Sequence, residues 1–176
     1  TRFFALADTI EALNFEKTNQ GHGWMALRFQ LRPDSAPNDC VMHIKMHDND
    51  PLQQQMALGV VGVNLLYACM FITDPDEILN SMVDGLAPKR IEIDTFRLSG
   101  PDFKNVDNRL MALELVKNGF TKAAMFGPDG TIMLPSEALY KRNVLVLRGR
   151  FRPVTHVNAD MMFASRRHFR NEPDVE

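Results

Sequence analysis

Two stretches in the first third of the chain alternate between apolar and polar residues, over residues 24–31 and 40–47. A period of two is typical of a β-strand with one buried face. Residues 33–39, which lie between them, are rich in Pro and Asp and are typical of a turn. The two stretches therefore predict an antiparallel hairpin with a long loop. Its apolar face would consist of Met25, Leu27, Phe29, Leu31, Cys40, Met42, Ile44 and Met46.

Other segments have apolar residues at the spacing of an α-helix. Two of them begin with an acidic residue before a proline, at Pro51 and at Pro75, which is a signal for a helix start. Gly85 and Gly119 are placed to end two of them. The expected helices cover residues 3–14, 51–72, 75–85, 105–119 and a segment after residue 157.

The remaining apolar runs are short and alternate with these helices. Residues 90–98 predict a strand, and residues 122–126 and 131–134 predict a small hairpin around a turn. Residues 143–149 are apolar almost throughout, as in a strand buried on both faces. The pattern therefore predicts an α/β fold, with a mostly parallel sheet flanked by helices and the N-terminal antiparallel hairpin at its edge.

The apolar segment Met56–Ile72 contains one polar side chain, Asn64. Its length, roughly 17 residues, is short of the roughly 20 that cross a membrane, and no Lys or Arg flanks it. We therefore expect no membrane span. The segment predicts a central helix buried on most sides, covered by the 76–85 helix, by the N-terminal helix or by a second subunit.

The composition is that of one soluble domain. The chain has 176 residues, of which 45% are hydrophobic and 24% charged, and its formal net charge is −2. This charge favours neither nucleic acid nor an anionic membrane as a partner. Cys40 and Cys69 lie among apolar residues without C-x-x-C spacing, which indicates reduced core cysteines of a cytoplasmic protein. We expect one α/β domain over residues 1–155 and a C-terminal helix or tail, residues 156–176, that begins a further region of a longer protein.

Residues 147–158, LRGRFRPVTHVN, partly match the phosphate-binding turn G-x-F-x-P-x-(H/T)-x-G-H of nucleotidyltransferases. Val157 and Asn158 replace the glycine that lets a helix N-terminus approach phosphate and the histidine that stabilises transferring charge. The segment also comes near the end of this chain, whereas in that family it follows the first strand. We therefore expect a strand end followed by an X-Pro turn, although Gly149, Phe151, Pro153 and Thr155 match the motif.

Polar residues follow several expected strands. Asp48 and Asp50, after the second strand of the hairpin, have the hard oxygen ligands that Mg²⁺ or Mn²⁺ prefers, and they also suit a helix N-cap and an acidic first turn. The other candidates suit an anionic ligand, because parallel strands bring their carboxyl ends to one edge of the sheet. They are Asp102, Asp107, Arg109, Arg150 and His156.

Three blocks carry a resemblance to a known family: LQQQMALGVVGVNLLYACMF, SGPDFKNVDNRLMALELVKNGFTKAAMF and ALYKRNVLVLRGRFRPVTHVN. They resemble blocks that occur in the same order in a family of uncharacterised bacterial proteins, some of which are labelled nicotinamide-nucleotide adenylyltransferase. The resemblance covers residues 20–163 and implies that this chain is the N-terminal or middle part of a larger protein. It implies no established activity.

Three functions are compatible with these patterns. The first is a cytoplasmic domain that binds a small anionic ligand, a nucleotide or a phosphorylated metabolite, with or without a divalent metal, at the carboxyl edge of the sheet. The second is a non-enzymatic assembly domain in which the helix at residues 50–72 buries against another chain, in a homo-oligomer or against the remainder of a longer chain. The third is an adenylyltransferase-like enzyme. The sequence does not decide whether the protein is an enzyme.

Overall fold

The computed structural model describes residues 1–173, which form two compact units. The first unit is Thr1–Leu134 and lies wholly inside the domain expected over residues 1–155. The second unit begins at Pro135.

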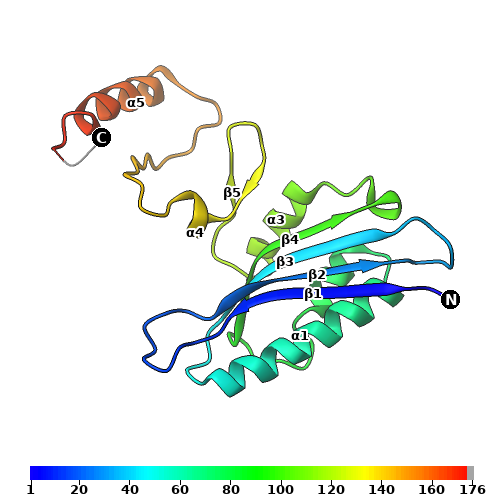
Figure 1. Cartoon of the computed structure of the whole chain (residues 1–176). Coiled ribbons are helices and arrows are strands. Elements are labelled where there is room, and N and C mark those ends of the chain that lie inside the picture. The colour runs from blue at the N-terminus through cyan, green and yellow to red at the C-terminus, as the bar shows by residue number, and fades with distance from the viewer. Residues whose placement is uncertain (174–176) are drawn as a thin grey trace. The chain divides into compact units, whose positions relative to one another are not determined.

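The first unit is built on an antiparallel four-stranded sheet in the order β1-β2-β3-β4 (Figure 1). The expected hairpin is confirmed as β2 and β3, whose residues Met25 and Met42 are directly paired. The apolar positions expected on its inner face lie in the core, apart from Leu31, which is partly buried. The strands are β1 (Phe4–Glu11), β2 (His22–Phe29), β3 (Asn38–Met46) and β4 (Ile91–Ser99).

The expectation of a mostly parallel sheet is wrong, because every neighbouring pair of these strands is antiparallel. In a parallel connection, one helix after β3 brings the chain back to the level at which β3 starts, and the next strand begins there. Helix α1 (Pro51–Phe71) does this, since Arg2 bridges Met70 near its end to Leu31 beside the start of β3. Helix α2 (Pro75–Ser81) and the loop after it then carry the chain back, so β4 begins opposite Met46.

The helix expected over residues 3–14 is also wrong, because these residues form β1. Their apolar spacing fits a helix, but Phe4 pairs with Phe29 and Ile10 pairs with Gly23 in the sheet. Pairing with β2 satisfies the backbone of this segment, and such tertiary pairing overrides a weak local preference.

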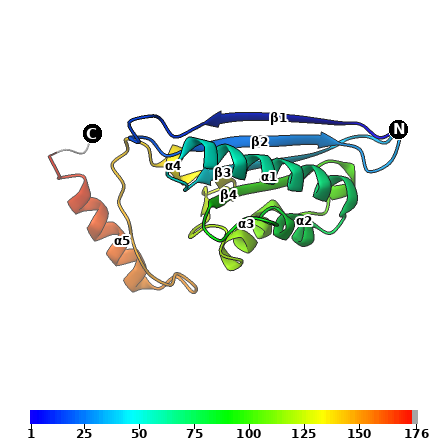
Figure 2. The same ribbon diagram turned by 90° about the horizontal axis from the view of Figure 1, so that it is seen from below.

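Helices α1, α2 and α3 (Asn108–Lys117) pack on one face of the sheet, and their buried side chains join a single core with it (Figure 2). The caps expected from sequence are present: Asp50 accepts a hydrogen bond from the backbone N–H of Gln53, and Asp74 accepts from those of Asp76 and Glu77. A short 3₁₀ helix, η1 (Pro101–Phe103), follows β4.

Helix α1 is less covered than the sequence suggested. Within the described chain it packs on the sheet and beside α2, where Asn64 donates to the carbonyl oxygens of Met82 and Asp84. Its opposite side is exposed among the described residues, and the N-terminal segment expected to cover it as a helix is strand β1. By length and composition α1 is the one helix of the described residues that could cross a membrane, and a third of its most apolar window (33%) is buried inside the domain. Burial by a second subunit stays a prediction.

Both cysteines are free and buried, as expected from their apolar surroundings. Cys40 on β3 and Cys69 on α1 are neighbours in the core. Burial, helped by the adjacent Cys69, raises the pKa of the Cys40 thiol well above its usual value.

The expected small hairpin is confirmed as β5 (Met125–Phe126) and β6 (Ile132–Met133), which close the first unit. The second unit holds α4 (Pro135–Ala138) and α5 (His156–Phe169). The buried strand expected over residues 143–149 is absent from the described structure, because these residues have no regular secondary structure and most are exposed. An apolar run specifies a strand only where a neighbouring strand completes its hydrogen bonds.

Candidate functional site

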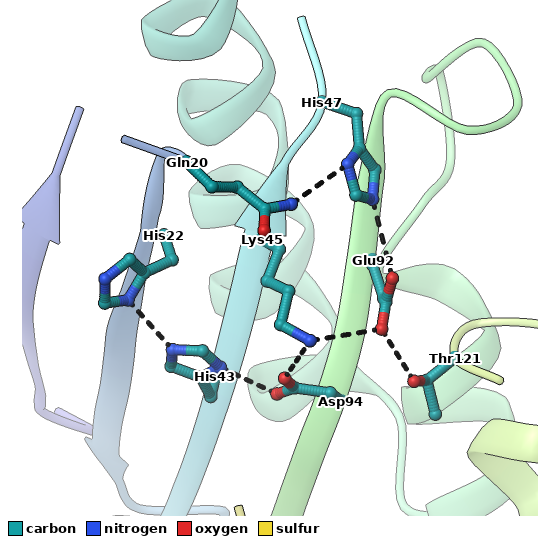
Figure 3. Close-up of polar contacts among 8 residues, drawn as sticks. All are labelled: Gln20, His22, His43, Lys45, His47, Glu92, Asp94 and Thr121. Carbon is teal, nitrogen blue, oxygen red and sulfur yellow. Dashed lines mark hydrogen bonds and ion pairs between the residues drawn. The ribbon is translucent and has the colours of Figure 1, made fainter. Parts of the chain in front are cut away.

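The candidate site is a network of polar side chains on the sheet face opposite the helices (Figure 3). Lys45 lies directly across from His22 on one neighbouring strand and from Glu92 on the other. Directly opposed residues in an antiparallel sheet point to the same face, so the three strands bring these groups together. Figure 3 shows the network, which consists of Gln20, His22, His43, Lys45, His47, Glu92, Asp94 and Thr121.

A β-bulge places Asp94 at the centre of this network. His43 pairs with Thr95 and the next residue, Ile44, pairs with Ile93, so Asp94 is the extra residue of β4. Bulges re-aim side chains and are frequent beside active sites. Here the Asp94 carboxylate oxygen Oδ1 accepts a hydrogen bond from Nδ1 of His43 over 2.7 Å, and both side chains are 2% exposed.

The hydrogen bond to Asp94 fixes the tautomer of His43. Because Nδ1 of a neutral His43 carries the proton, its Nε2 accepts, and Nδ1 of His22 donates to it over 3.2 Å. The ring of Trp24 covers His43 with 4.9 Å between centroids. The chain of contacts ends at the surface, where Nε2 of His22 lies 3.5 Å from Glu11.

Lys45 bridges the two carboxylates of β4. Its ammonium Nζ lies 3.0 Å from Oδ2 of Asp94 and 3.3 Å from Oε1 of Glu92. The approach to Oδ2 is at ion-pair distance but outside hydrogen-bond geometry, so this buried oxygen has a charged partner without a well-aligned donor. Removing the cation would leave a buried, uncompensated negative charge, which would destabilise the folded state.

Glu92 links this buried part to the surface. Its Oε1 accepts a hydrogen bond from Oγ1 of Thr121 over 2.8 Å, and its Oε2 lies 3.6 Å from Nε2 of His47. The side-chain amide of Gln20 donates to Nδ1 of His47 over 3.3 Å. A neutral His47 therefore carries its proton on Nε2, facing Glu92.

A cavity of about 530 Å³ adjoins the network. This volume lies in the range of small-molecule sites. Two lysines and His47 supply positive or protonatable groups, and Ile91 and Phe120 supply apolar surface. The lining residues are His47, Lys89, Ile91, Glu92, Gly119, Phe120, Thr121 and Lys122. A smaller cavity of about 240 Å³ shares His47 and also contains Gln20 and Asp48.

The ammonium groups of Lys89 and Lys122 are the available charges of the larger cavity. Both residues are exposed, and within residues 1–173 neither forms a salt bridge. Glu92, in contrast, is already bound by Lys45 and Thr121. The cavity therefore presents unpaired positive charge toward a ligand, beside a carboxylate that shares the cation of Lys45 with Asp94.

The structure assigns Asp48 and Asp50 to structural roles. Asp48 is paired with Arg90, whose guanidinium Nη2 lies 2.7 Å from its Oδ2, and Asp50 caps α1. Among the described residues no three His, Cys, Asp or Glu side chains are placed to hold a metal ion together. The metal site expected at Asp48 and Asp50 gains no support.

Asp102, Asp107 and Arg109 lie at the other end of the sheet from Asp48. Because β3 and β4 are antiparallel, their carboxyl ends are at opposite edges, and the single ligand-binding edge expected from sequence does not form. Asp102 binds Arg32 and Asn38 over 2.9 Å and 2.8 Å. Asp107 caps α3 and pairs with Arg109, and these hydrogen bonds lower the pKa of Asp107 to about 2.

Arg150 and His156 belong to the second unit and are exposed. His156 is the first residue of α5. Thr155 and Asn158, on either side of it in the motif, form a capping box. The side chain of Thr155 accepts from the backbone N–H of Asn158 over 3.3 Å, and Asn158 Oδ1 accepts from that of Thr155 over 2.9 Å. The side chains of Thr155 and Asn158 therefore cap α5, at the positions where the nucleotidyltransferase turn would bind phosphate.

Sequence reasoning missed the network, although one signal pointed to it. His43 and Lys45 occupy the polar positions of an alternating strand, and Glu92 and Asp94 occupy those of another. The missing information was that these strands are neighbours, which alternation cannot supply.

Lys45 gives the network a defined dependence on pH. Burial is the largest single influence on its pKa and lowers it, but Asp94 and Glu92 together outweigh burial and raise the pKa above its usual value of 10.5. A raised pKa stabilises the folded state fully below the unfolded pKa, and that stability is lost as pH rises through the folded pKa.

We therefore expect the difference in unfolding free energy between wild type and Lys45→Met to be constant up to about pH 10 and to shrink at higher pH. Urea unfolding of both proteins between pH 8 and pH 11.5 measures this difference. A difference that is independent of pH over the whole range would show that the Lys45 ion pairs do not contribute to folding.

A scan against protein-family models, a search of curated proteins and a search of solved structures found no match to this chain. The resemblance to the bacterial family therefore stays a prediction, and the function is argued from the site alone.

Proposed function

We propose that the protein is a binding domain for a small anionic molecule, with the ligand held in the cavity beside β4. The observation that carries the proposal is the lining of this cavity, in which two exposed lysines without a salt-bridge partner among the described residues stand beside His47 and an apolar wall. The sequence predicted that the ligand binds at the carboxyl edge of a parallel sheet. Because that edge does not form, we assign the ligand to this cavity instead.

The chemistry of the lining favours a phosphorylated ligand with a flat apolar part. Lys89 and Lys122 are point charges of the kind that bind phosphate or carboxylate. Phe120 lines the cavity and is partly exposed, so we assign it as the aromatic residue against which a base or another planar group stacks. A nucleotide or a phosphorylated metabolite combines these two features.

The network behind the cavity supports the same function. Glu92 is held in place by Lys45 and Thr121, and Lys45 offsets part of its negative charge while also pairing with Asp94. His47 gains positive charge on protonation and faces the same cavity. The polar groups are thus held in place before a ligand arrives, which lowers the entropic cost of binding.

Calorimetric titration with AMP and with inorganic phosphate tests the proposal. We expect wild type to bind AMP and the Lys89→Ala/Lys122→Ala double variant to bind it at least tenfold more weakly, since two charge contacts are lost. The matched control is Lys104→Ala/Lys141→Ala, which removes two exposed lysines that do not line the cavity and should leave binding unchanged.

Equal affinities of the double variant and the control would contradict the proposed site. Absence of heat with AMP, with inorganic phosphate and with pyrophosphate would contradict the proposed function. Binding of phosphate at the same affinity as AMP would keep the anion site but remove the role assigned to Phe120.

The proposal places the protein in the cytoplasm, where thiols remain reduced, because both of its cysteines are free. The adenylyltransferase function gains no support, since Thr155 and Asn158 cap α5. The assembly function rests on α1 and leads to a separate inference.

A further inference from the structure

The outer side of α1 is an apolar stripe that the described chain leaves exposed. Its members follow one another at intervals of three or four residues, so they lie along one side of the helix, opposite the residues buried against the sheet. Five of them are between 57% and 67% exposed. The stripe consists of Leu52, Met56, Gly59, Val63, Tyr67 and Phe71.

The composition of α1 is unlike that of a helix that faces water. Its 21 residues include no Asp, Glu, Lys or Arg, whereas a surface helix normally places such residues opposite its buried side. An exposed apolar stripe of this length on a globular domain marks an interface.

We propose that the stripe of α1 binds the same stripe of a second copy of the chain, with the two helices antiparallel about a two-fold axis. The shape of the stripe is the reason for choosing a second copy as the partner. A side chain added at Gly59 would meet nothing within 4 Å, so Gly59 is a notch in the stripe. Val63, one turn further on, is 67% exposed and projects from it.

A two-fold axis between these positions makes the stripe complementary to itself. In an antiparallel pair of helices, Val63 of each copy then lies over Gly59 of the other. The same axis brings Met56 opposite Tyr67 and Leu52 opposite Phe71, so every large apolar side chain gains an apolar neighbour. Such an isologous contact closes at two subunits.

The size of the stripe sets the expected strength. With on the order of 100 Å² of exposed surface from each of five side chains, two copies bury about 1,000 Å², at the lower limit of specific interfaces. The dimer should therefore dissociate in the micromolar range rather than be permanent.

The charges around the helix favour a protein over a membrane as the occupant. Asp50 precedes α1, and Asp74 and Asp76 follow it, whereas Asp48 is paired with Arg90. Arg2 lies over the ring of Phe71, as a single cation at one end of the stripe. Helices that lie on membranes have Lys and Arg beside their apolar side, because bilayer surfaces are anionic. Acidic residues at both ends of α1 oppose such binding.

Sedimentation equilibrium of the full chain tests the dimer. We expect the mass to rise from the monomer value of 20.0 kDa toward twice that value between about 1 and 100 µM. Val63→Glu should hold the monomer mass at 100 µM while its melting temperature stays near that of wild type, because Val63 is exposed in the monomer. The matched control is Leu110→Glu, which charges a similarly exposed position (60%) on α3 and should leave dimerisation unchanged.

Oxidation of a mixture of Gly59→Cys and Val63→Cys chains tests the register. A covalent heterodimer that exceeds either homodimer supports the antiparallel pairing. A monomeric wild type at 100 µM overturns the proposal, and so does dissociation by Leu110→Glu but not by Val63→Glu. Flotation of a monomeric wild type with zwitterionic or anionic vesicles would show that a lipid surface covers the stripe instead, and would also overturn it.

Discussion

Replacing Asp94 with alanine is expected to lower the free energy of unfolding by about 3 kcal/mol and the melting temperature by roughly 10 °C. The Asp94 carboxylate is buried and is the partner of both His43 and Lys45. Without it, His43 loses the acceptor of its Nδ1 proton and the ammonium of Lys45 loses its closer anion. Urea unfolding at pH 7 measures the loss.

Asp39→Ala is the matched control for this change. Asp39 is an aspartate on the same face of the sheet, paired with Arg28 across 2.7 Å, but its side chain and that of Arg28 are 34% and 59% exposed. An exposed pair of this kind is worth at most about 1 kcal/mol. If Asp39→Ala and Asp94→Ala lower the free energy of unfolding equally, burial of the network adds nothing to its contribution to stability.

A double-mutant cycle with Lys45→Met separates the ion pair from the rest of the network. We expect the losses of Asp94→Ala and Lys45→Met to be non-additive by about 1 kcal/mol or more, since each change removes the same contact. Asp94→Asn should be the milder substitution, because its amide oxygen still accepts from His43. This variant also provides a folded protein if Asp94→Ala fails to fold.

Gly100→Ala is expected to be the second strongly destabilising change, at about 3 kcal/mol. Gly100 ends β4 with a φ of 115° and a ψ of 177°, a combination that only glycine adopts without strain. A methyl group there would lie 2.7 Å from the Cα atom of Asn38. Asn38 is buried and binds both the backbone N–H and the carboxylate of Asp102, so it cannot easily move.

Gly119→Ala is the comparison for a positive φ without a steric clash. Gly119 also has a positive φ, 77°, but a methyl group there would meet nothing within 4 Å. We expect a loss of about 1 kcal/mol from the left-handed conformation. Thermal melting of the two variants gives the comparison, and a loss at Gly119 as large as that at Gly100 would show that contact with Asn38 is unimportant.

The structural roles of Asp102 and Asp107 also explain why the loop after β4 resembled a ligand site in the sequence. Asp102 and Asp107 are polar residues beside a Gly-Pro break, which is also the pattern of many binding loops. In the structure their carboxylates complete the turn and cap α3. Local structure accounts for both residues.

The sequence by itself determined the elements whose signals are local. Alternation predicts the β2–β3 hairpin and its core positions. Helical spacing predicts α1 to α3, and proline and acidic residues predict the caps at Asp50 and Asp74. Gly119 follows the end of α3 as expected, whereas α2 ends at Ser81 and not at Gly85. These signals act over a few residues, so a single sequence contains them.

Only the tertiary structure decided the rest, because it depends on which distant segments become neighbours. Residues 4–11 became a strand because β2 offered an edge to pair with, and residues 143–149 did not because no strand of the described chain pairs with them. The return of the chain through α2 made the sheet antiparallel and separated Asp48 from Asp102. The same return placed Glu92 and Asp94 beside Lys45 and His43, so the candidate site arose from strand adjacency and a bulge that no periodicity encodes.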